Sequence, residues 1–102
     1  MVKGIKGSKI CDYPSVAVIG SGYWGKNLVR NFFKLGALEL ICDKNDDLLA
    51  RFEEQYPGVE TCLAFNDVLA RDDIEGLVIA TPVETHFALA REALLVGKHV
   101  YV

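Results

Sequence analysis

Three closely spaced glycines are the residues of this chain whose spacing points most directly to chemistry. Gly20, Gly22 and Gly25 follow the apolar run Val-Ala-Val-Ile at residues 16–19, and a helical pattern begins behind them. Two neighbouring glycines let a backbone turn sharply and approach a pyrophosphate, and the third lets a helix lie close to a strand. Free N–H groups at the start of such a helix face anionic oxygens. Turns also need glycine for a positive φ without any ligand, so the pattern requires support from the rest of the chain.

An acidic residue at the end of the next apolar run supplies that support. Asp43 lies roughly 20 residues beyond Gly25, the spacing at which a carboxylate reaches the adenosine ribose of a dinucleotide. A carboxylate accepts from both ribose hydroxyls and repels a 2′-phosphate, so Asp43 favours NAD over NADP. The neighbouring cation Lys44 offsets this repulsion, which leaves NADP open. The alternative role of Asp43 is the N-cap of the following helix.

The remaining residues of the glycine turn are Ser21, Tyr23 and Trp24. All three belong to the predicted cofactor-binding turn, because main-chain N–H groups serve a pyrophosphate whatever the side chains are. Trp24 is in phase with Leu28 and Phe32, so its ring is expected to pack partly into the core. The ring of Tyr23 either packs in the same way or forms a wall at the nicotinamide end.

A second polar group stands where a later apolar run gives way to a helical pattern. Thr81, Pro82 and His86 follow the run at residues 76–80, and in a parallel sheet this position faces the same crevice as the glycine turn. Pro82 lacks an N–H and suits a first helical turn with no ligand involved. An imidazole can exchange protons near neutrality, yet a lone histidine at a helix start is also typical of a solvated or capping group. The residues alone leave the role of His86 open.

Apolar runs and helical patterns alternate along the whole chain. Strands are expected at residues 16–19, 38–42, 59–63, 76–80 and 99–102. The residues expected on buried helical faces are Trp24, Leu28, Phe32 and Leu35 in the first helix, Leu49, Phe52 and Tyr56 in the second, and Val83, Phe87, Ala90 and Leu94 in the last. Gly36 and Gly97 are expected to end the first and last helices, and Asn66 to cap a brief helix between them.

This alternation predicts an α/β fold, a doubly wound parallel sheet of the Rossmann type in a single domain. Strands that alternate with helices form βαβ units, whose right-handed crossovers build a parallel sheet with helices on both faces. The expected strand order is 3-2-1-4-5, with a ligand crevice at the carboxyl ends of strands one and four, where the order reverses. Residues 15–102 form the predicted dinucleotide-binding domain, and residues 1–14 are expected to be a flexible N-terminal arm.

Composition narrows the class of protein and of partner. With 102 residues, 51% hydrophobic content and a net charge of −3, the chain suits one soluble domain and does not suit nucleic acid as a partner. Cys11, Cys42 and Cys62 are odd in number and widely spaced, so we expect free thiols and neither disulfides nor a metal site. Without an apolar run of about 18 residues or a signal peptide, a cytoplasmic location and no membrane partner are expected.

Several stretches together resemble one family. They are Val-Ala-Val-Ile-Gly-Ser-Gly-Tyr-Trp-Gly-Lys-Asn at 16–27, Ala-Thr-Pro-Val-Glu-Thr-His at 80–86 and Ala-Leu-Leu-Val-Gly-Lys-His-Val-Tyr-Val at 93–102. The chain looks like the N-terminal domain of the glucose-fructose oxidoreductase, inositol dehydrogenase and rhizopine-catabolism (Gfo/Idh/MocA) family. The resemblance covers nearly everything from Val16 to Val102, and the Ala-Thr-Pro-x-x-x-His stretch followed by Gly-Lys-His-Val is its most specific part.

The resemblance implies NAD or NADP as cofactor and hydride transfer to or from a sugar, cyclitol or nucleotide-linked sugar. It implies that the three glycines lie at the pyrophosphate, Asp43 at the adenosine ribose, and Thr81, Pro82 and His86 beside the nicotinamide. The segment Gly-Tyr-Trp-Gly-Lys-Asn is similar to the corresponding segment of members that act on nucleotide-linked amino sugars. In such members a Glu-Lys-Pro segment follows the final strand, its lysine contributes to catalysis, and a larger α/β domain supplies the substrate pocket.

The sequence stops at Val102, before those parts. Hydride transfer needs a substrate carbon about 3–3.5 Å from the nicotinamide, so we expect cofactor binding without turnover, no catalytic residue in this chain and a missing C-terminal substrate domain as partner. An uncovered apolar face is expected to favour homo-oligomers. The alternatives are a stand-alone module that senses nucleotide or redox state, and another ligand such as S-adenosylmethionine or coenzyme A on the same architecture. The glycine spacing and the Ala-Thr-Pro-x-x-x-His stretch argue against the last of these.

Overall fold

The computed structural model describes residues 15–20, 22 and 25–102. The predicted N-terminal arm, residues 1–14, lies outside them. Helices and strands alternate through the described part of the chain: β1 (Val16–Ile19), α1 (Gly25–Lys34), β2 (Leu38–Cys42), α2 (Asp46–Gln55), β3 (Glu60–Cys62), α3 (Phe65–Leu69), β4 (Gly76–Ile79), α4 (Val83–Leu95) and β5 (His99–Tyr101). Among these helices, none has both the length and the apolar character that a membrane span requires.

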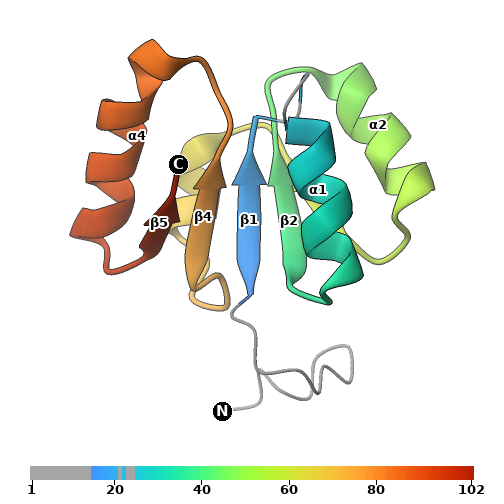
Figure 1. Ribbon diagram of the computed structural model, residues 1–102, viewed down its shortest axis with the longest axis horizontal. Helices are drawn as coiled ribbons and strands as arrows, with labels where there is room; N and C mark the ends of the chain where they lie inside the picture. Colours follow the sequence, from blue (N-terminus) through green and yellow to red (C-terminus); the bar gives the residue numbers. More distant parts are fainter. Residues whose placement is uncertain (1–14, 21, 23–24) are drawn as a thin grey trace.

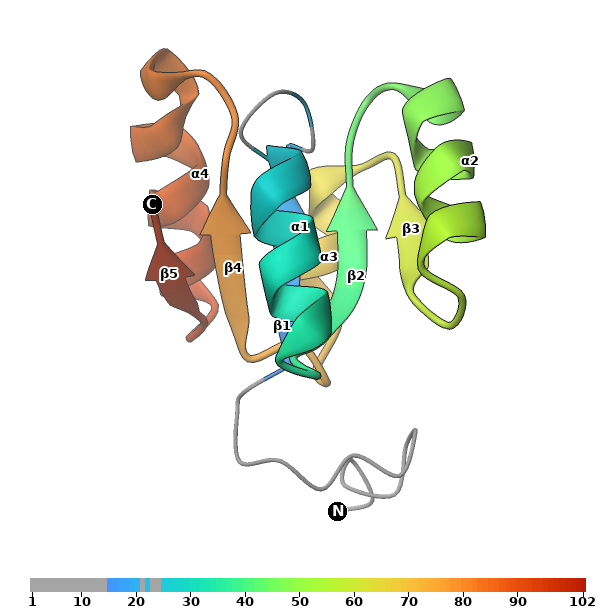
Figure 2. The same ribbon diagram turned by 45° about the vertical axis from the view of Figure 1, so that its right-hand side comes forward.

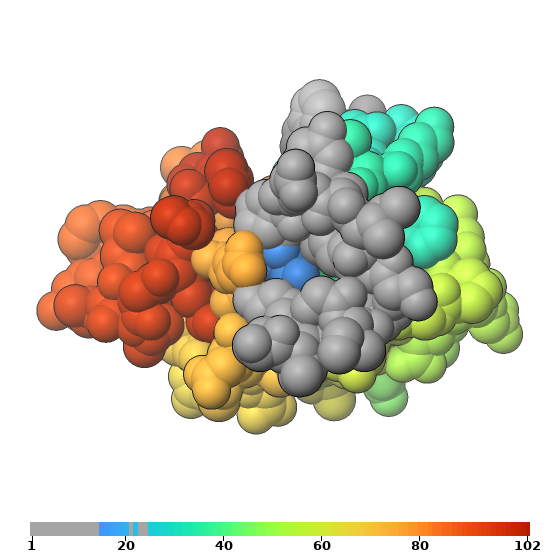
Figure 3. All heavy atoms as spheres, turned by 90° about the horizontal axis from the view of Figure 1, so that it is seen from below, coloured from blue at the N-terminus to red at the C-terminus, as the bar shows by residue number. Residues whose placement is uncertain are grey.

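The five strands form one parallel sheet in the order β3-β2-β1-β4-β5 (Figure 1). This confirms the predicted α/β fold and strand order. Right-handed crossovers on either side of β1 place α1 and α2 on one face of the sheet and α3 and α4 on the other. Figure 2 shows α1 in front of β1, and Figure 3, seen from the end where the strands begin, places α1 and the α3 region on opposite sides.

The central strand β1 shows why its sequence is a continuous apolar run. All four of its residues are buried, because helices cover both faces of the sheet. Val16 and Val18 belong to the core under α1 and α2, whereas Ala17 and Ile19 belong to the core under α3 and α4. An alternating pattern would leave one of these two cores without its strand residues.

Strand register brings the ends of the three central strands together. Ile19 pairs with Cys42 on β2 and with Ile79 on β4. The chain therefore leaves the sheet at Gly20, Asp43 and Ala80 on the same edge. Each of these residues still donates its N–H to a carbonyl of the neighbouring strand, at 2.8 Å for Gly20, 3.2 Å for Asp43 and 2.8 Å for Ala80. The residues that follow the strands are thus fixed by main-chain hydrogen bonds.

Local signals set most of the helix ends as predicted. Gly36 and Gly97 adopt positive φ values of 77° and 86° directly after α1 and α4, which confirms them as residues that end these helices. In α2, Leu49 and Phe52 are buried together with the C-cap residue Tyr56, as predicted. Strands β3, β4 and β5 are each shorter than the predicted runs by one or two residues.

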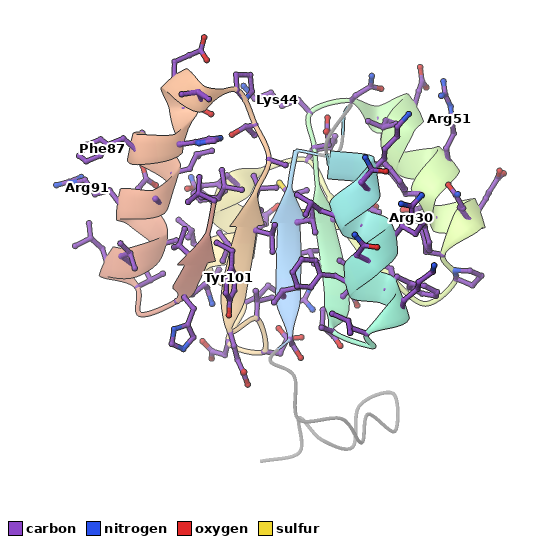
Figure 4. The ribbon with its side chains drawn as sticks, in the orientation of Figure 1. Arg30, Lys44, Arg51, Phe87, Arg91 and Tyr101 are labelled. Carbon is purple, nitrogen blue, oxygen red and sulfur yellow. The ribbon has the colours of Figure 1, made fainter. Side chains whose placement is uncertain are left out.

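The predicted buried face of α4 is wrong. Val83 and Phe87 are 78% and 79% exposed, and Leu94 is 61% exposed. Of the predicted residues only Ala90 packs against the core, next to Leu89 and the fully buried Ala93. The helix is apolar along two stripes, and the sheet takes the one with small alanines because they allow the helix axis to come close. Figure 4 shows the labelled Phe87 pointing away from the molecule.

Two smaller predictions also need correction. Asn66 does not cap α3, since the helix begins one residue earlier and its N-cap is Ala64. In α1 the residue buried against the sheet is Val29, while Leu28 and Phe32 are only partly buried. Leu35 lies beyond the end of α1 and is 44% exposed. Trp24 lies outside the described residues.

Candidate functional site

A cavity of about 790 Å³ lies at the carboxyl ends of β1, β2 and β4, within the size range of small-molecule sites. This is the position predicted for a ligand crevice from the reversal of strand order. Most of the side chains around the cavity are apolar, with a few polar groups among them. Its described lining consists of Ile19, Gly20, Gly22, Cys42, Asp43, Lys44, Leu63, Phe65, Ala80, Thr81, Pro82, Val83, Thr85 and Leu89.

The three glycines of the turn differ in how closely other atoms surround them. Gly20 has a φ of 85°, and a Cβ placed on it would lie 2.8 Å from Cγ2 of Thr81 and 3.0 Å from its nitrogen. A Cβ on Gly25 would overlap the carbonyl oxygen of Gly20, so the start of α1 lies directly against the turn. At Gly22 a Cβ would meet no described atom within 4 Å. Gly22 therefore leaves an open space at the cavity that packing within the described chain does not require.

Helix α1 directs its N-terminus to this space. The helix begins at Gly25, at the edge of the sheet where the strands end (Figure 2). The positive end of its dipole therefore lies beside Gly22, whose carbonyl oxygen accepts from the N–H of Lys26 at 3.1 Å. Its first turn contains no acidic residue, whereas the first turn of α2 contains Asp46 and Asp47. The charge that usually compensates a helix N-terminus is thus missing from α1, as expected where an anionic ligand binds.

Asp43 is held at the cavity by the main chain on both sides. Its N–H donates to the Cys62 carbonyl, and its Oδ1 accepts from the N–H of Asn45 at 2.8 Å. The N-cap of α2 is Asn45, whose Oδ1 accepts from the N–H of Leu48 at 3.1 Å. The alternative role of Asp43 as that N-cap is therefore wrong. Lys44 is exposed and lies at the same edge of the sheet (Figure 4).

The loop after β4 forms the opposite wall. Thr81 and Pro82 line the cavity together with Thr85, which sequence reasoning did not single out. The Oγ1 atoms of Thr81 and Thr85 lie 2.6 Å apart, and Thr85 Oγ1 donates to the carbonyl of Pro82 at 2.7 Å. His86 is half-buried and is not part of the described lining. Its Nε2 lies 2.7 Å from the carbonyl oxygen of Thr81, so the ring contacts the loop backbone.

Of the predicted site residues, the structure brings together Gly20, Gly22, Asp43, Lys44, Thr81 and Pro82 around the cavity. Gly25 and His86 are not in the described lining but contact the lining residues Gly20 and Thr81, and Ser21, Tyr23 and Trp24 fall outside the described residues. Sequence reasoning missed Leu63 and Phe65, which reach the cavity from the end of β3. The predicted order 3-2-1 was the signal for them, because β3 beside β2 brings its following residues next to Asp43.

The two described cysteines are neutral thiols at neutral pH. Cys42 and Cys62 face each other across β2 and β3 and are free. Burial, followed by the neighbouring Cys62, raises the pKa of Cys42 to about 12. Burial also raises the pKa of Cys62. Cys42 therefore contributes an apolar surface to the cavity, and among the described residues no cluster of three or more His, Cys, Asp or Glu side chains suits a metal ion.

Relatives of known sequence and structure share this architecture. The chain is 35% identical over 102 aligned residues to the "Glycosyl hydrolase family 109 protein 2" of Shewanella sp. (strain ANA-3), covering 89% of this chain and 22% of that protein. The WlbA dehydrogenase from Bordetella pertussis, solved in complex with NADH and UDP-GlcNAcA, has a TM-score of 0.75 and 29% identity over 86% of this chain and 28% of its own.

A second solved structure agrees with the first. UDP-N-acetylglucosamine 3-dehydrogenase GnnA from Acidithiobacillus ferrooxidans has a TM-score of 0.74 and 26% identity, covering 84% of this chain and 27% of its own. The chain thus spans between a fifth and a third of the length of each of these relatives. The model of one family, described as "Oxidoreductase family, NAD-binding Rossmann fold", matches residues 15–102. Together with the fold and the glycine turn, this match shows that the chain belongs to the Gfo/Idh/MocA oxidoreductase family and corresponds to its NAD-binding Rossmann domain.

Proposed function

We propose that this chain binds NAD in the cavity at the carboxyl ends of β1, β2 and β4. The observation that carries the proposal is the open space at Gly22, beside the N-terminus of α1. A helix N-terminus without acidic residues attracts an anion, and a glycine at this position admits a pyrophosphate close to the backbone. In this arrangement Gly20, Ser21, Gly22, Tyr23, Trp24 and Gly25 form the pyrophosphate-binding turn.

Asp43 and Lys44 decide between NAD and NADP in this proposal. The Asp43 carboxylate accepts from the ribose hydroxyls, and its negative charge opposes a 2′-phosphate. Its position is fixed by the Asn45 N–H and by its own N–H on Cys62. The exposed Lys44 retains its conformational freedom, so its compensation of that charge is partial. NAD is therefore the preferred cofactor, and NADP binds more weakly.

The reaction that would use the bound cofactor is a hydride transfer. In this proposal the nicotinamide side of the ligand faces Thr81, Pro82 and His86. Nε2 of the His86 ring is already hydrogen-bonded to the Thr81 carbonyl oxygen. The hydride would pass between the nicotinamide and a sugar, a cyclitol or a nucleotide-linked sugar, which is supported by the dehydrogenase names of the relatives. In this proposal the described residues around the cavity bind and orient the cofactor, and no step of the transfer is assigned to them.

Isothermal titration of the chain with NAD and with NADP tests the proposal. The informative variant is Asp43→Asn, because an asparagine oxygen still accepts from the Asn45 N–H while the charge is removed. We expect NAD to bind more tightly than NADP to the wild-type chain and this preference to shrink in Asp43→Asn. Asp47→Asn, on an exposed position of α2 outside the cavity lining, is the control and keeps the preference. Binding of neither dinucleotide by folded wild-type chain would contradict the proposal.

A further inference from the structure

The loop that follows β4 contains a chain of hydrogen bonds with a fixed direction. Thr85 Oγ1 donates to the carbonyl oxygen of Pro82 at 2.7 Å. A hydroxyl has a single proton, so in the 2.6 Å contact between Thr81 and Thr85 the proton must come from Thr81. The Thr81 hydroxyl therefore has only acceptor lone pairs left to offer to the cavity that it lines.

The same reasoning fixes the proton on His86. The carbonyl oxygen of Thr81 can only accept, so the Nε2 atom 2.7 Å away must carry a hydrogen and donate it. Together His86 and Thr85 hold the main-chain carbonyls of Thr81 and Pro82 at the end of β4. Both donors come from the first turns of α4, so the helix anchors the loop that precedes it.

The position of this loop matters to the rest of the site because it touches the glycine turn. Thr81 lies so close to Gly20 that a single added methyl group would come within 2.8 Å of its Cγ2 and 3.0 Å of its nitrogen. A displacement of Thr81 therefore changes the distance between the two walls of the cavity. His86 contacts the main chain of this loop through the Thr81 carbonyl and is not among the residues described as lining the cavity.

We propose that His86 is a positioning residue that acts through Thr81 and does not contact the cofactor. It holds the loop so that the Thr81 hydroxyl presents lone pairs to donor groups of the ligand, such as ribose hydroxyls or a carboxamide NH2. The N-terminus of α1, where the positive end of the helix dipole meets the glycine turn, takes the phosphates. The acceptor lone pairs of Thr81 and the positive end of α1 thus suit different parts of the dinucleotide and give it one orientation. This inference rests on the proposed binding of NAD.

The hydrogen bond itself is tested without any ligand. The imidazole ¹⁵N spectrum of the 102-residue chain contains the signals of two histidines, and a His86→Asn variant assigns those of His86 by their loss. We expect neutral His86 to carry its proton on Nε2, with exposed His99 as the internal comparison. A neutral ring that carries its proton on Nδ1 would overturn the inference.

The binding test uses two variants that differ in the reach of their amide. In His86→Gln the side-chain nitrogen reaches the place of Nε2 and restores the donor, whereas in His86→Asn it is too short. With NAD as the probe we expect His86→Asn to weaken binding about three- to tenfold, as the loss of one hydrogen bond does. We expect His86→Gln to stay within about twofold of the wild type.

AMP is the second probe, because it carries the adenosine half of NAD and lacks the half that faces Thr81. All three proteins are expected to bind AMP equally, which also shows that the variants are folded. Equal losses of NAD binding in both variants, an equal loss of AMP binding, or no change in His86→Asn would each overturn the positioning role. If the wild-type chain binds neither AMP nor NAD, the proposed function fails and the inference fails with it.

Discussion

The contact between Gly25 and Gly20 predicts a large difference between two alanine substitutions in the same turn. A Cβ on Gly25 would overlap the carbonyl oxygen of Gly20 and lie 2.9 Å from its carbonyl carbon. Gly20 cannot move away, because its N–H donates to the Cys42 carbonyl and Thr81 lies against its other side. The strain of Gly25→Ala must therefore displace α1, whose Val29 is fully buried against the sheet.

The size of the effect follows from these constraints. Overpacking a fixed site costs about 1–3 kcal/mol, and with backbone on both sides of the contact we expect the upper part, about 3 kcal/mol. The intrinsic helix preference of alanine, about 1 kcal/mol in a helix interior, offsets little of this because Gly25 is the first residue of α1. At Gly22 no described atom lies within 4 Å of the added methyl group, so Gly22→Ala should change stability by less than about 0.5 kcal/mol.

Urea unfolding monitored by circular dichroism gives both free energies of unfolding, and titration with NAD gives the matching affinities. Gly25→Ala is expected to lower the denaturation midpoint strongly and to reduce the melting temperature by roughly 4–8 °C for each kcal/mol. Gly22→Ala is expected to fold as well as the wild type and to lose NAD affinity, because its methyl group enters the space proposed for the pyrophosphate. Wild-type stability in Gly25→Ala, or an equal loss of stability in Gly22→Ala, would refute the reasoning.

Two other predictions concern buried polar groups. Burial raises the pKa of Cys42 from 9.0 to about 12, so the folded chain keeps a proton that the unfolded chain loses. The free energy of unfolding should fall as the pH rises above about 9, and urea midpoints of Cys42→Ala should fall less; equal slopes would contradict this. The buried Lys98 donates from Nζ to the Arg71 and Ile74 carbonyls, both at 2.7 Å. Lys98→Met should cost about 2 kcal/mol in urea unfolding, against little change in exposed Arg91→Met, and equal midpoints for the two variants would show the reasoning wrong.

The central strands and the strand order follow from the sequence because β1 and β4 are short apolar runs and β2 is nearly so, each between helical patterns. In a parallel sheet covered on both faces, burial requires only that all residues of a strand be apolar, as in β1. The reversal of strand order then locates the cavity without further information. Gly20, Gly22 and Asp43 were found in this way, since they directly follow the strands that the order places side by side.

Side-chain directions were the part that the sequence did not determine. In α4 two apolar stripes compete, and only the space above the sheet selects the one with Ala93 over the one with Phe87. The cap of α2 is a similar case, because Asp43 and Asn45 are both suitable residue types and the turn geometry assigns the role to Asn45. The type and position of His86 suggested a ligand contact, but the hydrogen bond of its ring to Thr81 appears only in three dimensions.

The position of the cavity across the sheet also has a consequence for local opening. The wall near Ile19 belongs to β1, which is paired on both sides and fully buried. The wall near Leu63 follows the short edge strand β3, and Leu63 itself is 52% exposed. Amide hydrogens at the first wall should exchange with solvent only when the whole domain unfolds, and those at the second in frequent partial openings. A ligand in the cavity would contact both the stable end of β1 and the locally opening end of β3. Much of its effect on stability would therefore appear as slower amide hydrogen exchange at the β3 edge.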